Sequence, residues 1–89
     1  MPRISREIKI KNAQGLHARP AALFVQKAAK YNSQITVTKD GESVNGKSIM
    51  GILMLGAQQN SKITLIADGA DAPDAIAELE QYLLTEEAK

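Results

Sequence analysis

The chain has 89 residues, 44% of them hydrophobic, which is enough for one folded domain and unlike the composition of a disordered chain. It has no cysteine and one histidine, which excludes disulfides and thiolate metal sites and argues against a structural zinc site. The net charge is +1, but residues 1–47 hold nine Lys and Arg against three Asp and Glu, whereas residues 48–89 hold two against seven. This asymmetry predicts either two differently solvated faces or a basic surface that attracts acidic partners.

No stretch of about 18 apolar residues is present, and the first residues lack the apolar region of a signal peptide. Together with the absence of cysteine, this predicts a cytoplasmic protein without membrane insertion. We expect residues 1–89 to form a single domain that needs no cofactor and no metal. A domain of this size leaves little room for an enclosed substrate pocket of its own.

Residues 3–11 predict a half-buried strand, because apolar positions alternate with charged ones. The apolar positions are Ile4, Ile8 and Ile10. A helix is predicted from Ala18 to about Tyr31, where apolar residues recur at helical spacing. Its apolar face consists of Ala21, Phe24, Val25 and Ala28.

Residues 34–39 alternate in polarity and predict a second strand. The following Asp40-Gly41 is typical of a two-residue hairpin turn, which leads into a third strand over residues 42–45 with Val44 pointing inward. A short helix is then predicted up to about Leu55, because a serine suited to an N-cap precedes it and a glycine follows it.

Residues 61–67 predict the fourth strand, with an alternating apolar set. That set is Ile63, Leu65 and Ala67. After the Asp68-Gly69 turn, Asp71 has the residue type of an N-cap, and an early proline and first-turn acids indicate the start of a last helix. The apolar stripe of this helix is Ile76, Leu79, Tyr82 and Leu83. We expect residues 85–89 to fray.

The element order β-α-β-β-α-β-α predicts an α+β fold. Because every strand alternates in polarity, we expect one face of the sheet to be buried and the strands to be antiparallel. The expected architecture is an open-faced β-sandwich, in which three helices cover one face of a four-stranded antiparallel sheet.

The stretch Gly15-Leu16-His17-Ala18-Arg19-Pro20-Ala21 places the only histidine at the start of a predicted helix. Free amides and the positive end of the helix dipole suit a phosphate or another anion there. The same field favours a neutral imidazole, which can act as a nucleophile and hold a phosphoryl group. Arg19 can bind the phosphoryl oxygens, and Lys27 and Lys47 can extend a basic surface. The alternative is a loop histidine that only caps the helix, beside an arginine without a binding role.

Ser48 is predicted to cap the short helix, and its hydroxyl is also a candidate for phosphorylation, which would add roughly −1.5 to −2 charge. The short helix carries more apolar residues than one buried face needs. If Ile52 and Leu55 face the core, a second apolar set points outward and forms a patch for docking partners, unless the assumed helix phase is wrong. The outward set is Met50, Leu53 and Met54, with Ile49 at the border.

These features together resemble the HPr family, the histidine-containing phosphocarriers of the bacterial phosphoenolpyruvate-dependent sugar phosphotransferase system. The heptad around His17 is similar to the active-site signature of that family, and Lys47-Ser48-Ile49-Met50-Gly51 is similar to its regulatory serine signature. The resemblance covers essentially the whole chain. It implies that enzyme I phosphorylates His17 at Nδ1, that Arg19 contacts the phosphoryl group, and that the group passes to a histidine of a IIA domain.

The resemblance further implies that an HPr kinase/phosphorylase modifies Ser48, and that phosphoserine hinders enzyme I or recruits a transcription regulator. Two alternatives stay open, a carrier of the nitrogen-regulatory branch and a mainly regulatory interaction domain controlled at Ser48. A regulatory homologue that lacks the histidine exists, and His17 argues against that identity. We expect a monomer that is a carrier and not an autonomous enzyme.

A nucleic-acid-binding module is a further hypothesis, because the first half of the chain is basic. Such modules stack bases on aromatic residues of the sheet. The aromatic residues here all fall on predicted helices, so we expect no nucleic-acid partner. They are Phe24, Tyr31 and Tyr82.

Overall fold

The computed structural model describes residues 2–11, 15–16 and 18–84. The elements follow the predicted order: β1 (Arg3–Lys9), α1 (Ala18–Ala29), β2 (Gln34–Lys39), β3 (Glu42–Asn45), α2 (Ile49–Leu55), β4 (Lys62–Asp68) and α3 (Ala72–Leu84). The predicted fraying of residues 85–89 falls outside the described residues. The first strand is two residues shorter than predicted, although Ile10 stays fully buried and its amide donates to the carbonyl of Ser61 at 2.9 Å.

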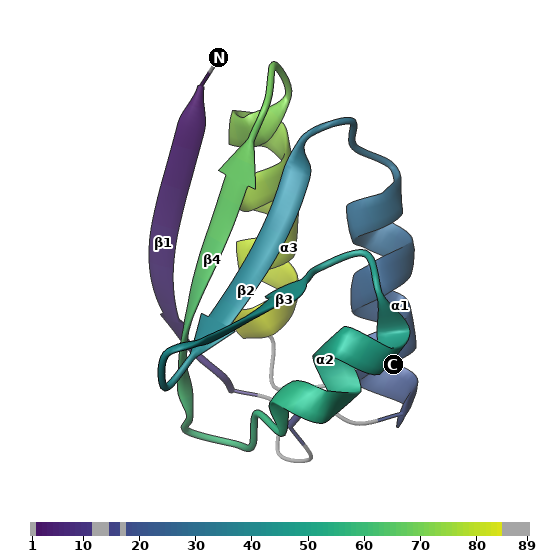
Figure 1. The fold of residues 1–89 in the computed structure, drawn as a ribbon, viewed down its shortest axis with the longest axis vertical. Helices are drawn as coiled ribbons and strands as arrows, with labels where there is room; N and C mark the ends of the chain where they lie inside the picture. Colours follow the sequence, from purple (N-terminus) through teal and green to yellow (C-terminus); the bar gives the residue numbers. More distant parts are fainter. Residues whose placement is uncertain (1, 12–14, 17, 85–89) are drawn as a thin grey trace.

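The four strands form one sheet in the order β1-β4-β2-β3, and every neighbouring pair is antiparallel (Figure 1). Apolar residues of neighbouring strands meet in register, as Ile8 does with Ile63, and Leu65 with Val37. All four side chains are almost completely buried. The predicted period-two alternation therefore gives the sheet one buried face, as expected for an antiparallel sheet covered on one side.

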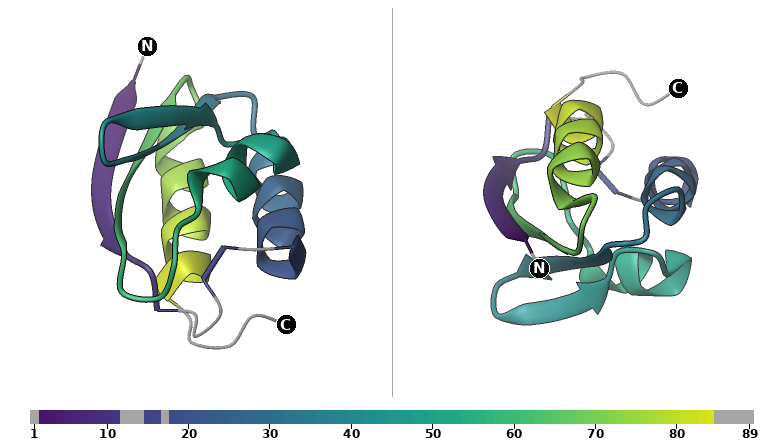
Figure 2. Two further views of the ribbon diagram at one scale, coloured as in Figure 1. Left: turned by 60° about the horizontal axis from the view of Figure 1, so that its bottom comes forward. Right: turned by 90° about the horizontal axis from the view of Figure 1, so that it is seen from above.

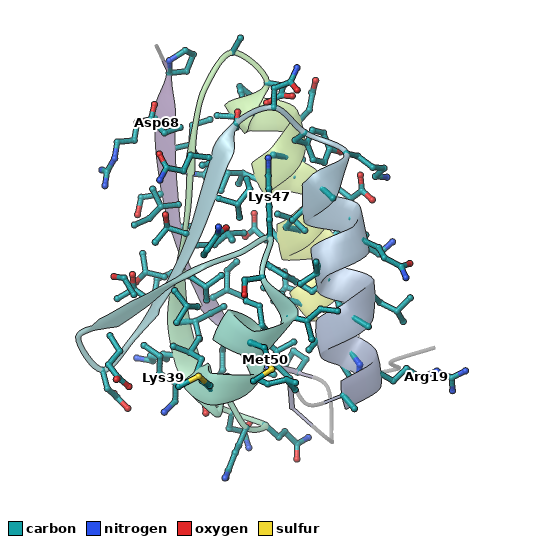
Figure 3. All side chains as sticks on the ribbon, turned by 45° about the vertical axis from the view of Figure 1, so that its right-hand side comes forward. Arg19, Lys39, Lys47, Met50 and Asp68 are labelled. Atoms are coloured by element: carbon teal, nitrogen blue, oxygen red, sulfur yellow. The ribbon has the colours of Figure 1, made fainter. Side chains whose placement is uncertain are left out.

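Helices α1 and α3 lie on the buried face of the sheet, and α2 contacts α1, β2 and β3 (Figure 2). The open-faced sandwich predicted from the sequence is therefore confirmed. Helix α1 starts at the end of the molecule that carries Arg19 and runs toward the end that carries Asp68 (Figure 3). Within the described residues, none of the helices combines the length and hydropathy required to cross a bilayer.

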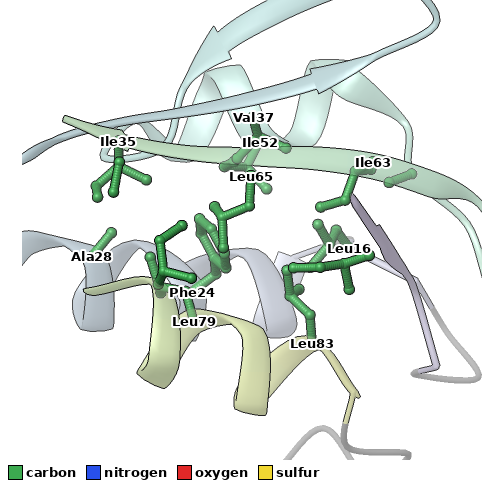
Figure 4. Packing of buried hydrophobic residues seen from close by; sticks show 14 of the residues in the cluster. Leu16, Phe24, Ala28, Ile35, Val37, Ile52, Ile63, Leu65, Leu79 and Leu83 are labelled. Atoms are coloured by element: carbon green, nitrogen blue, oxygen red, sulfur yellow. The ribbon is translucent and has the colours of Figure 1, made fainter. Parts of the chain in front are cut away.

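The core lies between the helices and the sheet (Figure 4). Phe24 of α1, Leu79 of α3 and Leu65 of β4 are fully buried there. Burying one side chain of this size stabilises the fold by about 1.5–3 kcal/mol before the cost of ordering it. The hairpin turn also follows the prediction, because Asp40 and Gly41 have φ values of 52° and 84°, both in the left-handed region that a type I′ turn requires.

Asp71 directly precedes α3, at the predicted N-cap position, but its carboxylate has partners outside that helix. It accepts hydrogen bonds from the amides of Asn32 and Ser33 at 2.8 and 2.9 Å, and from the Ser33 hydroxyl. These bonds, the hydroxyl first, lower the pKa of Asp71 from its ordinary value of 3.8. The carboxylate therefore fastens the connection between α1 and β2 to the start of α3, a contact that local sequence signals do not reveal.

Candidate functional site

Gly15 and Leu16, shortly before α1, are packed tightly against the segment that follows α2. Leu16 is only 3% exposed, and its amide donates to the carbonyl of Ala57 at 2.8 Å. Gly15 has a φ of 69°, and a β-carbon on it would lie 2.5 Å from the carbonyl oxygen of Ala57. Both the backbone conformation and the close approach therefore require glycine at this position.

The predicted acceptor, His17, lies outside the described residues. Its chain neighbour Ala18 is the first residue of α1, and Arg19 is exposed one residue further along. Figure 3 shows the Arg19 side chain extending away from the helix. The first turn of α1 contains no acidic residue. The first amides of a helix lack intrahelical partners. This turn can therefore bind an anion through free amide donors and through a guanidinium that is open to solvent.

We call the end of the molecule around this turn the loop end, defined by residues 10–11, 15–16, 18–20, 57–61 and 82–83. Two hydrogen bonds connect α3 to the chain on either side of the loop. The amide of Lys11 donates to the carbonyl of Leu83 at 3.2 Å, and the hydroxyl of Tyr82 donates to the carbonyl of Pro20 at 3.2 Å. Sequence reasoning missed both contacts. A bond between two backbone groups leaves no mark in the sequence, and Tyr82 is read from the pattern as one more apolar position of the α3 stripe.

The short helix α2 is capped as predicted. The Ser48 hydroxyl accepts from the amide of Gly51 at 3.1 Å, and Gly56 ends the helix with a φ of 67°. Ile52 and Leu55 are buried, which confirms the predicted helix phase. The exposed fractions of the outward side chains are 43% for Ile49, 65% for Met50 and 76% for Met54.

Leu53 departs from the predicted exposed set, because it is half-buried and packs against the core. Helix α2 contacts both α1 and the β2–β3 edge of the sheet, so its buried arc is wider than that of a helix on a single surface. The exposed apolar patch therefore centres on Met50 and Met54, with Ile49 at its border.

The basic residues predicted around the histidine are not gathered in one place. Lys47 donates from Nζ to the carbonyl of Tyr31 at 2.6 Å, near the C-terminal end of α1. Figure 3 shows the Lys47 side chain running away from the end that carries Arg19 and Met50. Lys27 lies with its Nζ 3.7 Å from the carboxylate of Glu78. Both ammonium groups are drawn to oxygen atoms of the fold itself, which leaves Arg19 as the exposed cation of the first turn of α1.

Known proteins that are similar to this chain share both its sequence pattern and its fold. A family model described as "PTS HPr component phosphorylation site", where PTS denotes the phosphotransferase system, matches residues 4–85. The HPr-like protein Crh of Bacillus subtilis (strain 168) is 41% identical over 83 residues, which cover 93% of this chain and 98% of Crh.

Two solved structures extend the likeness to the backbone. The phosphocarrier protein HPr of Bacillus anthracis str. Ames superposes with a TM-score of 0.89 at 42% identity, covering 91% of this chain and 96% of that one. Bacillus subtilis Crh, described as a catabolite repression protein with a swapped domain in a dimer, gives a TM-score of 0.77 at 40% identity, covering 97% and 99%. Identity of this level over nearly the whole chain, together with the family model and the shared fold, places the chain in the HPr family of the phosphotransferase system.

Proposed function

We propose that this chain is a phosphocarrier that accepts a phosphoryl group on Nδ1 of His17 from phosphorylated enzyme I and delivers it to a histidine of a IIA domain. The family match carries the proposal, because a model described by its phosphorylation site spans residues 4–85 and the chain has a histidine in the matching heptad. The exposed guanidinium of Arg19 beside that position supports it.

In the forward step, the lone pair of Nδ1 forms a bond to phosphorus as the bond between phosphorus and its carrier group on enzyme I breaks. The second transfer repeats this exchange with the IIA histidine as nucleophile. Phosphoryl transfer depends mainly on positioning and on neutralising the charge of the oxygens. Arg19 and the first-turn amides of α1 supply both here, so the chain acts as a carrier and the larger partners complete the catalytic site.

A second role, regulation through Ser48, is favoured by the similarity to Crh, whose structure is described as that of a catabolite repression protein. Ser48 caps α2 directly beside the exposed Ile49 and Met50. A phosphate on this hydroxyl would place negative charge at the border of an apolar docking patch. We propose that an ATP-dependent HPr kinase/phosphorylase modifies Ser48, and that this charge weakens docking of enzyme I or recruits a transcription regulator.

The two roles are distinguished by the chemical stability of the phosphate that the chain acquires, which we call the label. With enzyme I and phosphoenolpyruvate, we expect a phosphate that is labile in acid and stable in base, which then moves to an added IIA protein. His17→Ala should abolish this label, whereas Ser48→Ala, the matched control at the other motif, should retain it. Full labelling of the His17→Ala variant would show that the proposed acceptor is wrong.

We propose that the carrier acts in the cytoplasm. We also propose that it is a monomer, because each transfer needs His17 to meet a different partner in turn. A dimer is described for the related Crh. Light scattering after size-exclusion chromatography tests this point. The mass of one chain at working concentration would support a monomer, and twice that mass would overturn it.

A further inference from the structure

The last turn of α3 is fastened to the chain on both sides of the loop that contains the proposed acceptor. On the entering side, the amide of Lys11 donates to the carbonyl of Leu83. On the leaving side, the hydroxyl of Tyr82 donates to the carbonyl of Pro20, in the first turn of α1. Figure 2 shows the end of α3 and the start of α1 at the same end of the molecule.

Tyr82 is suited to a lasting hydrogen bond with Pro20. Its ring is half-buried, and Nζ of Lys27 lies 5.5 Å from the ring centroid, so the ring is held between α1 and α3. Burial raises the pKa of Tyr82, which further favours the protonated phenol that donates this bond. Pro20 is fully buried and has no amide hydrogen, so the phenol bond reaches this turn through the carbonyl.

We propose that Tyr82 is a positioning residue for phosphoryl transfer, because its hydroxyl fixes the first turn of α1 and thereby the guanidinium of Arg19. This inference rests on the proposed function and adds a part to it. Arg19 immediately precedes Pro20 in the chain, so a shift of the Pro20 carbonyl moves the Arg19 backbone with it. Misplacing a charged group by about 1 Å is enough to slow a transfer step substantially.

The test compares two tyrosines that both connect α1 to α3. Tyr82→Phe removes the hydroxyl at the loop end and keeps the ring. Tyr31→Phe is the matched control, because the Tyr31 hydroxyl donates to Glu78 of α3 near the opposite end of α1. Each variant loses one hydrogen bond between α3 and one end of α1, but only the Tyr82 bond reaches the turn that carries Arg19.

Two readouts are measured for each variant. The first is the rate of phosphorylation by enzyme I and phosphoenolpyruvate, with this chain as the substrate. We expect Tyr82→Phe to lower kcat by about fivefold at an unchanged KM, because one neutral hydrogen bond changes an equilibrium constant by about that factor. The NMR order parameter of the Arg19 amide should fall in the same variant. Tyr31→Phe should leave both quantities at their wild-type values.

The other outcomes overturn the inference in distinguishable ways. A wild-type kcat for Tyr82→Phe, with the label on His17, would remove the role of Tyr82 and leave the phosphocarrier function standing. A loss of kcat in Tyr31→Phe that equals or exceeds the loss in Tyr82→Phe would show a general effect of stability. If the wild-type chain is not labelled at His17 at all, the proposed function fails and the role of Tyr82 fails with it.

Discussion

The two ends of the helical layer are held together by different chemistry. At one end, which we call the clamp end (residues 30–33, 47 and 69–78), carboxylates make the connections. Asp71 accepts from Asn32 and Ser33, and Glu78 accepts from Tyr31 and, at 2.7 Å, from Nζ of Lys30. At the loop end, the connections described above are neutral hydrogen bonds between backbone groups or from a phenol to a carbonyl. Charge-assisted bonds are roughly twice as strong as neutral ones.

This difference separates the groups that hold the fold from the turn at which we propose that a phosphoryl group binds. A carboxylate beside Arg19 would occupy the guanidinium and repel an incoming phosphoryl group. The first turn of α1 contains no acidic residue. The carboxylate of Glu78 in α3 instead pairs with Lys27, in the last turn of α1, and with Lys30, just after that helix. The loop end is therefore positioned by close packing and neutral bonds, which leave the positive charge of Arg19 available.

Among variants that test this difference between the two ends, Gly15→Ala at the loop end is expected to lose the most stability. The new β-carbon would meet the carbonyl of Ala57 and also force alanine into a left-handed conformation, so we expect a loss of about 2 kcal/mol or more in the free energy of unfolding. Gly56→Ala is the control, because Gly56 has nearly the same φ, 67°, with open space around it. It should lose only about 1 kcal/mol.

Urea unfolding of both variants measures these losses. The Gly15→Ala variant should also accept phosphate more slowly than the Gly56→Ala variant, measured under conditions where both are folded. Equal stabilities and equal rates in the two variants would show that the contact between Gly15 and Ala57 does not position the loop.

Sequence patterns predicted nearly all of the fold, because polarity alternation, helical spacing, caps and the hairpin turn are local properties. They also predicted that Met50 and Met54 are exposed, since burial of Ile52 fixes the phase of a short helix. They failed where a polar group reaches across the molecule. Lys47 was placed near the histidine motif, but its ammonium binds the carbonyl of Tyr31, a partner that only the folded chain brings within reach.

The clamp end should make stability sensitive to acid. Hydrogen bonds from Ser33 and Asn32 lower the pKa of Asp71 below 3.8 in the folded protein, so the folded state holds the ionised form more favourably than the unfolded state does. The resulting stabilisation is fully present above the unfolded pKa and is lost as pH falls through the folded one. Asp71→Asn should therefore lower the unfolding temperature at pH 7, and the difference from wild type should shrink below about pH 4.

Thermal unfolding followed by circular dichroism between pH 2 and 7 checks this prediction. Asp74→Asn provides the control, because Asp74 lies in the first turn of the same helix with an exposed side chain. If the unfolding temperatures of Asp71→Asn and of the wild type differ by the same amount at every pH in this range, the proposed origin of the acid sensitivity is contradicted.

The smallest effect on stability is expected at the apolar patch of α2. Met50 is 65% exposed, so Met50→Ala should change the free energy of unfolding by no more than about 0.5 kcal/mol. If the patch docks enzyme I, the same variant should bind that partner several-fold more weakly. Ile66→Ala, on strand β4 of the sheet, is the control for binding. Isothermal calorimetry with enzyme I measures the affinity of both variants. Unchanged affinity for Met50→Ala would remove this residue from the docking surface.

The central claim is that the imidazole of His17 carries the phosphoryl group, and NMR of the ¹⁵N-labelled protein tests it most directly. After treatment with enzyme I and phosphoenolpyruvate, the spectrum should show phosphorus bonded to Nδ1 of His17, with the Arg19 signals shifted and the Ser48 signals unchanged. Phosphorus attached at any other residue, or no phosphorylated species in the presence of active enzyme I, would contradict the account.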